Sequence, residues 1–395
     1  MRTIQIPSIE DIHEPEDVVI RNERDPAEYP RPTGRNADSD IDSDLDRGVA
    51  CYSLGCGVFF TRGVWMMSDY ATIQYGSTLR GRGIGWTEIR LRNPLMASNG
   101  HPRPDVAMLN IGSDYVGGSN ASVSDLSLIA SNSLIGDALV TSGVRGWGEG
   151  IRIERVKAGG IRGSVKPVGQ LAIPYEAFGI SFGIGVGGHR VADCEVYGEP
   201  GAYFSAYSSN ADGQYKTIFE RCVAFCQDGY AALTVYDHAV FRDCHAERFG
   251  YGVYNDTGDV NGGVLVDSCD LIVSRVGVGL VVTENRGFKS GIKIRDTSFK
   301  CLTKNPWVGL ELIDRSSDKS GQFTDIEFVG CRFEGRERLT LLSTDAGRNN
   351  VRGVRFIDCQ FRDDAVIRTG LNDIEIIRPR NLDGMLIEKQ IPSVL

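Results

Sequence analysis

A repeated pattern of nine segments constrains the fold of this chain more than any other feature. Each segment places an apolar residue three positions before a central residue, which we call the pivot, and an apolar residue two positions after it. The pivots are Leu126, Val156, Cys194, Cys222, Cys244, Cys269, Thr297, Cys331 and Cys359. They recur roughly every 29 residues, with irregular spacing but a constant local register. This pattern is typical of a solenoid, in which each coil keeps its shape while the loops vary in length.

The repeats alternate apolar and polar residues at a period of two, as in IRIERVKA and VFRDCHA. Helical solenoids would show a period of about 3.6. Leucine-rich repeats would show an L-x-x-L-x-L pattern, which the segments lack. The sequence therefore predicts an all-β chain that folds as a right-handed parallel β-helix over residues 57–395.

The residues before the repeats have a different character. Residues 1–37 are rich in proline and charge and show no sustained period, which predicts an extended N-terminal arm. The run NADSDIDSDLDRG follows, and its acids raise the alternative of a calcium loop. An EF-hand loop needs Gly at its sixth position and Glu at its twelfth, and both are missing here. A capping helix over residues 38–56, with Asp38 as its N-cap, is the better interpretation.

The first strands carry a recognisable motif, GVFFTRGVW followed by IQYGSTLRGRGIGWTEIRL. These residues resemble the entrance to the pectate-lyase-like β-helix superfamily, which includes polysaccharide lyases, glycoside hydrolases and bacteriophage tailspikes. The resemblance covers residues 57–91 closely and continues beyond them only as the repeat pattern. It implies a β-helix and a polysaccharide partner, and it does not specify an activity.

Six of the ten cysteines occupy the pivot position. In a β-helix the pivots should point inward and stack about 4.8 Å apart, whereas a disulfide prefers about 3.8 Å between Cβ atoms. Free, buried thiols are therefore expected, which suits assembly in a reducing compartment. A zinc site needs ligands that converge on one point, so we expect no metal and no cofactor.

Acidic residues end several second strands, in ALTVYDH, GVYNDTGD, GLVVTEN, GLELIDRSSD and LTLLSTDAG. We call them the acidic row: Asp237, Asp256, Glu284, Asp314 and Asp345. Acids one rung apart would lie about 5 Å apart, and those two rungs apart about 9.6 Å, which brackets the carboxylate separations of glycoside hydrolases. Asp256 and Glu284 are the leading catalytic pair, with Asp237 and Asp314 as further candidates. Alternatively, the acids only cap turns.

Sugar-binding candidates lie beside these acids and in one insertion. Tyr254 could stack on a sugar, and Asn255 and Asn285 could orient it through hydrogen bonds. The insertion GAYFSAYSSNADGQY, which contains Tyr203 and Tyr207, has a composition that suits adaptable recognition. An ordinary surface loop explains the insertion equally well.

Lyase chemistry would instead need a base and a group that neutralises a uronate carboxylate. Arg378-Pro379-Arg380 is only faintly similar to the R-x-P-x-x-R element of pectate lyases, and its spacing differs. The W-x-D-H element of that family is also missing, which argues against calcium-dependent pectate lysis.

The charge and the start of the chain limit its partners and its location. With 43 Lys and Arg against 52 Asp and Glu, the net charge of −9 argues against general binding to nucleic acid or anionic membranes. No stretch is long and apolar enough to span a bilayer, and the first residues do not resemble a secretory signal. Synthesis and folding in a cytoplasm are therefore expected.

Three functions are compatible with these features. The first is a phage tailspike-like protein of the virion surface, assembled in the host cytoplasm, that binds and in one version hydrolyses a host polysaccharide. Such a protein would be a homotrimer, and its arm would bind another virion protein. The second is a cellular, cytoplasmic β-helix enzyme acting on carbohydrate, as hydrolase, lyase or transferase. The third is a structural or capsid-decoration protein. The role of the N-terminal arm distinguishes the first two functions, because the arm of a virion protein would bind another virion protein, whereas the arm of an enzyme would only cap the first coil.

Overall fold

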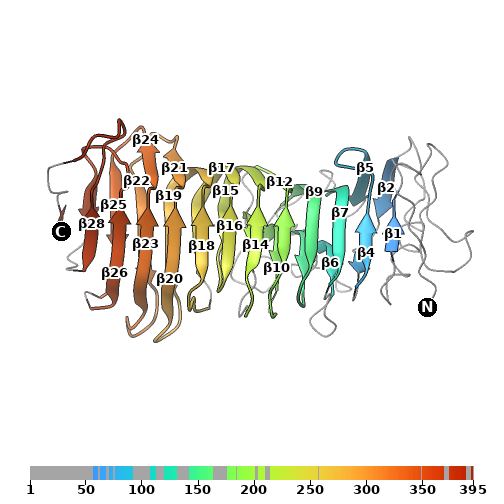
Figure 1. The fold of residues 1–395 in the computed structure, drawn as a ribbon, viewed down its shortest axis with the longest axis horizontal. Coiled ribbons are helices and arrows are strands. Elements are labelled where there is room, and N and C mark those ends of the chain that lie inside the picture. Colours follow the sequence, from blue (N-terminus) through green and yellow to red (C-terminus); the bar gives the residue numbers. More distant parts are fainter. Residues whose placement is uncertain are drawn as a thin grey trace, which may run out of the picture. The chain divides into compact units, whose positions relative to one another are not determined.

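The structure is a computed structural model that describes most of residues 57–394 (Figure 1). The gaps within this range are residues 61–62, 68–70, 74–75, 92–106, 113–119, 131–141, 163–175, 184, 201–202, 210–213, 257, 348, 369–372 and 388–392. The predicted arm at 1–37 and capping helix at 38–56 lie outside the described residues. Every regular element within the described part is a β-strand. Among these residues there is accordingly no helix with the length and apolar character needed to cross a membrane.

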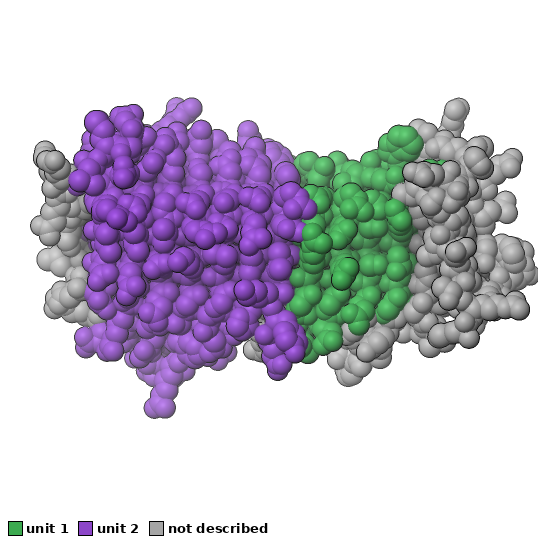
Figure 2. Space-filling model, viewed as in Figure 1, with its two compact units in different colours: residues 1–204 green, residues 205–395 purple. Residues whose placement is uncertain are grey.

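The chain divides into two compact units, residues 1–204 and 205–395, which Figure 2 colours separately. The first unit contains β1 (Gly57–Phe59), β2 (Gly63–Met67), β3 (Ala71–Ile73), β4 (Thr78–Arg80), β5 (Thr87–Leu91), β6 (Ala107–Ile111), β7 (Ser122–Ile129), β8 (Ser142–Gly146), β9 (Arg152–Ile161), β10 (Ala177–Phe182), β11 (Arg190–Ala192) and β12 (Glu195–Gly198). Within this unit β4, β7, β9 and β11 pair in parallel, which places Leu79, Val123, Ile153 and Val191 in one register.

The second unit contains the remaining strands, of which β13 (Phe204–Ser208) begins at the unit boundary. They are β14 (Thr217–Glu220), β15 (Val223–Thr234), β16 (Ala239–Arg242), β17 (His245–Asn255), β18 (Val264–Asp267), β19 (Asp270–Val282), β20 (Phe288–Arg295), β21 (Ser298–Cys301), β22 (Trp307–Asp314), β23 (Gln322–Val329), β24 (Arg332–Gly335), β25 (Leu339–Thr344), β26 (Val351–Ile357), β27 (Val366–Arg368), β28 (Ile374–Ile377) and β29 (Ser393–Val394).

Parallel pairing in this second unit reproduces the predicted register. The apolar residues three positions before the pivots lie opposite one another along β14, β16, β18, β20, β23 and β26. They are Phe219, Phe241, Val266, Ile294, Phe328 and Phe356, and all are fully buried. Each coil therefore packs on the next through matching side chains, and the predicted right-handed parallel β-helix is confirmed.

A sharp bend precedes every pivot. The residue just before it has a positive φ, near the left-handed region, as at Asp243 (53°), Ser268 (54°) and Asp296 (47°). The bend turns the pivot inward, and where the pivot is cysteine or threonine its side-chain donor reaches the carbonyl two residues earlier. Cys269 Sγ bonds Asp267 O at 3.4 Å and Thr297 Oγ1 bonds Arg295 O at 2.9 Å. The six pivot cysteines are buried and carry free thiols, as the register predicts.

Candidate functional site

One outward face of the second unit combines aromatic and charged side chains. Val253, Val278 and Leu310 lie in register on β17, β19 and β22 and are fully buried in the core. The next residues in register are Tyr254, Gly279 and Glu311. Because successive side chains of a strand point to opposite faces, this second row points outward.

Three tyrosine rings gather on this face. Their centroids are 5.5 Å apart for Tyr230 and Tyr251, 5.0 Å for Tyr230 and Tyr254, and 4.5 Å for Tyr251 and Tyr254. Gly279 leaves the room that they need, since a Cβ there would lie 2.6 Å from Tyr251 Cδ1 and 3.1 Å from Tyr254 Cδ2. We call the three tyrosines, together with Arg275 and Glu311, the tyrosine face.

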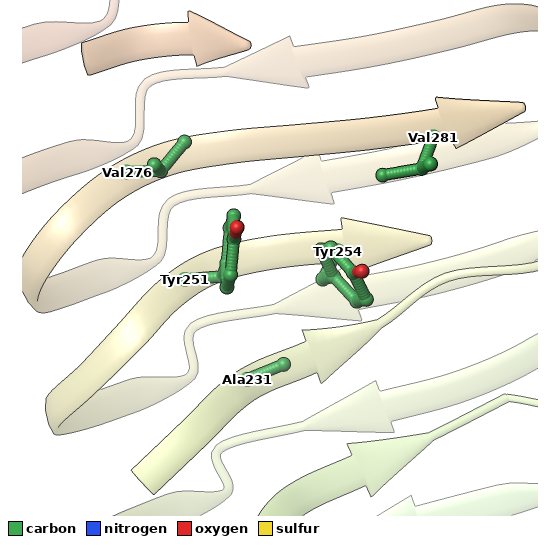
Figure 3. Packing of buried hydrophobic residues seen from close by; sticks show 5 residues of the cluster. All are labelled: Ala231, Tyr251, Tyr254, Val276 and Val281. Atoms are coloured by element: carbon green, nitrogen blue, oxygen red, sulfur yellow. The ribbon is translucent and has the colours of Figure 1, made fainter. Parts of the chain in front are cut away.

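Apolar side chains from neighbouring strands support the rings. Figure 3 shows Ala231 of β15, Tyr251 and Tyr254 of β17, and Val276 and Val281 of β19 side by side. Tyr251 and Tyr254 are 6% and 2% exposed, so they form the base of the face. Tyr230 is only partly buried and Arg275 is exposed, so these two side chains reach solvent.

A chain of hydrogen bonds links the tyrosines to an acid. Tyr230 Oη donates to Tyr254 Oη at 2.6 Å, and Tyr254 Oη donates to Asp256 Oδ2 at 3.2 Å. Burial, and then the charge of Asp256, raise the pKa of Tyr254 well above its usual range. Tyr254 therefore remains a donor at any physiological pH and holds the Asp256 carboxylate in place.

Arg275 and Glu311 occupy the other side of the rings. Arg275 Nη2 donates to Tyr251 Oη at 3.2 Å, and its Cζ lies 5.2 Å from the Tyr251 ring centroid. Burial raises the pKa of Glu311, although the charges of Arg275 and Arg315 oppose this effect. The Glu311 carboxyl forms no hydrogen bond and no ion pair with any described residue. It is thus a half-buried carboxyl free to exchange a proton with a bound molecule.

Beside this face lies Lys289, a lysine that is 1% exposed. Its ammonium donates to Asn255 Oδ1 and to the carbonyl of Gly258. Burial lowers the pKa of Lys289 to about 8, opposed by the charges of Asp259, Asp256, Glu284 and Asp237. The charges of three members of the acidic row, Asp237, Asp256 and Glu284, therefore act on one buried cation.

Three of the predicted site residues point into the interior. Asn255 is fully buried, and its Nδ2 donates to Val235 O at 2.7 Å. Asp314 is also fully buried and accepts hydrogen bonds from Ser316 N and Gly321 N, each at 2.9 Å. Tyr207 is fully buried, with its hydroxyl on Val223 O at 2.7 Å. Their side chains organise the core and the turns, so a sugar cannot reach them in the folded chain.

Other predicted residues hold loops together. Asn285 is exposed, and its Oδ1 accepts from Ser317 N at 3.0 Å and Ser317 Oγ at 2.9 Å. Asp237 accepts from Asn261 Nδ2 at 2.9 Å. Tyr203 belongs to the first unit, is partly buried, and its carbonyl accepts from Ala177 N at 2.9 Å. Of the predicted residues, therefore, Tyr254 belongs to the tyrosine face and Asp256 is hydrogen-bonded to it.

Four members of the site were not predicted from the sequence: Tyr230, Tyr251, Arg275 and Glu311. A signal for them exists in the x-Gly-aliphatic pattern at Gly252, Gly277 and Gly309, which lie in register. The residues two positions after these glycines form the outward row of Tyr254, Gly279 and Glu311. Among the described residues, no three or more His, Cys, Asp and Glu side chains are placed to hold a metal ion.

Searches of the sequence against protein-family models and against curated proteins find no match. Solved structures do show the same fold. A variant catalytic domain of GH87 α-1,3-glucanase with tetrasaccharides matches at a TM-score of 0.52 and 13% identity, over 88% of this chain and 68% of that one. A mutant tailspike of E. coli bacteriophage HK620 with a hexasaccharide also matches at 0.52, with 9% identity, over 88% of this chain and 75% of that one.

A third structure is the A-module of the mannuronan C-5 epimerase AlgE6 from Azotobacter vinelandii, with a TM-score of 0.45 and 14% identity, over 90% of this chain and 93% of that one. At these identities the likeness concerns the architecture alone. The fold that the entrance motif and the repeat predict is confirmed at that level: the chain has a parallel β-helix fold, as these structures do.

Proposed function

We propose that the chain binds a polysaccharide on the tyrosine face of its second unit. The observation that carries the proposal is the outward cluster of three tyrosines with a cation and two carboxyls around it. Tyr230 reaches solvent over the buried rings of Tyr251 and Tyr254, and a tyrosine ring offers rigid apolar surface with a polar tip, which suits the mixed character of a sugar. The fold supports the proposal, because two structures that share it were solved with bound oligosaccharides.

We further propose that the bound glycan is hydrolysed by Glu311 and Asp256. Glu311 is in register with Tyr254 two strands away, and Asp256 lies two residues beyond Tyr254, which corresponds to a backbone separation of about 12 Å between Glu311 and Asp256. Carboxyl groups of inverting glycosidases lie about 6.5–9.5 Å apart, a range that side chains leaning across Gly279 can reach. Glu284, on the far side of Asp256 near Lys289, remains the alternative second carboxylate.

The proposed reaction transfers two protons. Protonated Glu311 gives its proton to the glycosidic oxygen as the bond from that oxygen to the anomeric carbon breaks. Water adds to the anomeric carbon, and the Asp256 carboxylate accepts the proton that this water loses. The raised pKa of Glu311 supports its assignment as the acid, and the bond from Tyr254 fixes the orientation of the base.

The test is a screen of the purified chain against capsular and cell-wall polysaccharides, with binding and the release of reducing ends as readouts. On a polymer that the native chain cleaves, Glu311→Gln and Asp256→Asn should each lower turnover about 100-fold or more. Both variants should leave the melting temperature nearly unchanged. Glu334→Gln, on β24, is the control that should retain full turnover. Full activity in both site variants, with loss in Glu284→Gln, would transfer the acid role to Glu284. Binding without cleavage would leave an adhesin.

As the setting of this activity we propose the virion surface, in a homotrimeric spike resembling a phage tailspike. The support is the shared fold with a tailspike and the column of free, buried thiols, which suits assembly in a reducing cytoplasm. A cellular β-helix enzyme is the second candidate, favoured by the equal likeness to a glucanase domain. The oligomeric state separates them, as argued in the Discussion.

A further inference from the structure

Arg275 of the tyrosine face and Arg315 at the end of β22 carry charges that no ion pair balances among the described residues. Some arginines of the second unit form ion pairs, as Arg295 does with Asp267 at 2.6 Å. Among the described residues, neither Arg275 nor Arg315 lies within 4.0 Å of a carboxylate. The charges of both arginines nevertheless act on the same two side chains, because each charge lowers the pKa of Tyr251 and of Glu311.

Arg275 is held in a fixed orientation. Its guanidinium lies over the Tyr251 ring and donates one hydrogen bond to the Tyr251 hydroxyl at 3.2 Å. The remaining N–H groups of the fork have no acceptor among the described residues. Arg315 approaches from the end of β22, where its backbone N–H bonds Val282 O at 2.7 Å. One guanidinium thus lies on the Tyr251 ring, and the charge of a second arginine acts on the same tyrosine, on a protein whose net charge is −9.

The nearby acids do not neutralise these forks. Asp256 accepts the hydrogen bond of Tyr254, and Asp345 accepts that of Asp314 N at 2.8 Å while lying 3.5 Å from Lys319 Nζ. Burial favours the uncharged form of Glu311 by raising its pKa. The N–H groups of Arg275 that do not contact Tyr251 therefore remain available to an acceptor on a bound molecule.

We propose that the polysaccharide bound here is acidic, and that Arg275, assisted by Arg315, binds the carboxylates of its sugar units. A guanidinium and a carboxylate form two parallel charge-assisted hydrogen bonds, which neither a neutral sugar nor a lysine reproduces. This inference rests on the proposed function, since it names the substrate class of the same face.

The experiment measures binding of the full chain to a panel of acidic and neutral capsular polysaccharides, and to each acidic polymer after chemical reduction of its carboxyls to alcohols. The proposal expects binding to acidic polymers and at least a ten-fold loss on carboxyl reduction. Equal or tighter binding of neutral or reduced polymers would overturn the acidic substrate and keep polysaccharide binding. No binding across the panel would overturn both.

Variants then assign the contact to its residue. Arg275→Gln should weaken binding of the acidic polymer at least ten-fold, reduce the salt dependence of the affinity, and leave binding of the reduced polymer unchanged. Arg275→Lys should restore the salt dependence but only part of the affinity, because the charge returns without the fork. Arg352→Gln, which removes an exposed arginine of β26, is the control. If Arg275→Gln binds the acidic polymer as tightly as this control does, the assignment is wrong.

Discussion

The ammonium of Lys289 is a deeply buried charge in the second unit. It is 1% exposed, yet four carboxylates act on it and only a side-chain amide and a carbonyl accept its hydrogen bonds directly. The loss of hydration on burial destabilises the charged ammonium more than these partners stabilise it, so the pKa of Lys289 falls to about 8. Between pH 8 and 10.5 the unfolded chain therefore holds a proton at this lysine that the folded chain releases.

This difference predicts a stability that rises with pH. The unfolding free energy of the native chain, relative to that of Lys289→Met, should increase by up to about 3 kcal/mol as the pH rises from about 8 to 10.5. Subtracting the Met variant removes the titration of every other group. Urea denaturation at four pH values measures the difference. If the difference is constant over this range, Lys289 keeps its ordinary pKa in the fold.

Serine at a pivot is a second prediction at this scale. A buried hydroxyl without a partner would cost about 1–3 kcal/mol, but Thr297 shows that a pivot hydroxyl finds the carbonyl two residues earlier. Cys269→Ser should therefore cost no more than about 1 kcal/mol. Cys269→Leu should cost about 1–3 kcal/mol, because the bend leaves no room for added methylenes. A larger loss for Ser than for Leu in thermal denaturation would contradict this reading.

Strand parity explains which site residues the sequence could locate. The acidic row was predicted by aligning Gly279 of GLVVTEN with Gly252 and Gly309, but in the structure Gly277 is the residue that lies beside those two glycines. The predicted alignment of β19 was therefore wrong by two residues. In the correct register Asp256 lies beside Val281 and Ile313. Asp314 follows Ile313, so its side chain points to the opposite face, into the core. Glu311 and Arg275 were missed because they join Tyr251 only after the coils stack.

At the scale of the element, glycines allow the coils to turn a shared corner. Gly252, Gly277 and Gly309 follow one another in register, and a Cβ on Gly252 or Gly277 would lie 2.7 Å from the carbonyl oxygen of the glycine in the next coil. A backbone carbonyl engaged in the parallel sheet cannot move aside without disturbing its ladder. The strands that carry the tyrosine face therefore need glycine at this corner in order to stack.

Gly277→Ala tests this corner. The added methyl group should cost about 1–3 kcal/mol through overpacking and should also displace the strands that carry Tyr254 and Glu311. The matched control is Gly347→Ala, in an exposed turn where the nearest atom is a side-chain nitrogen at 3.3 Å. Equal urea midpoints for the two variants would show that the corner accommodates a methyl group without loss of stability.

At the scale of the molecule, the repeat alone predicts the β-helix, because one register recurs while loop lengths vary. The association state depends on surfaces that no repeat specifies. Exposed apolar side chains gather near the C-terminal end, where Ile377, Met385 and Leu386 are 38%, 62% and 56% exposed. Association between chains would cover them.

We therefore predict that light scattering at micromolar concentration gives three times the monomer mass of 43.2 kDa. Replacing Met385 and Leu386 together by Ser should shift the population toward smaller species if these side chains take part. A mass of 43.2 kDa across the concentration range would contradict the trimer and favour the cellular-enzyme candidate.

The pivot thiols place a chemical reporter inside individual coils. A reagent such as iodoacetamide reaches a buried thiol only while its own coil is open, so the alkylation rate of each cysteine measures the opening free energy at that position. After cleavage with trypsin, Cys222, Cys244, Cys269, Cys331 and Cys359 fall on different peptides and can be followed separately by mass spectrometry. The native chain thus allows opening to be mapped coil by coil, showing whether it frays from one end or separates at an interior coil.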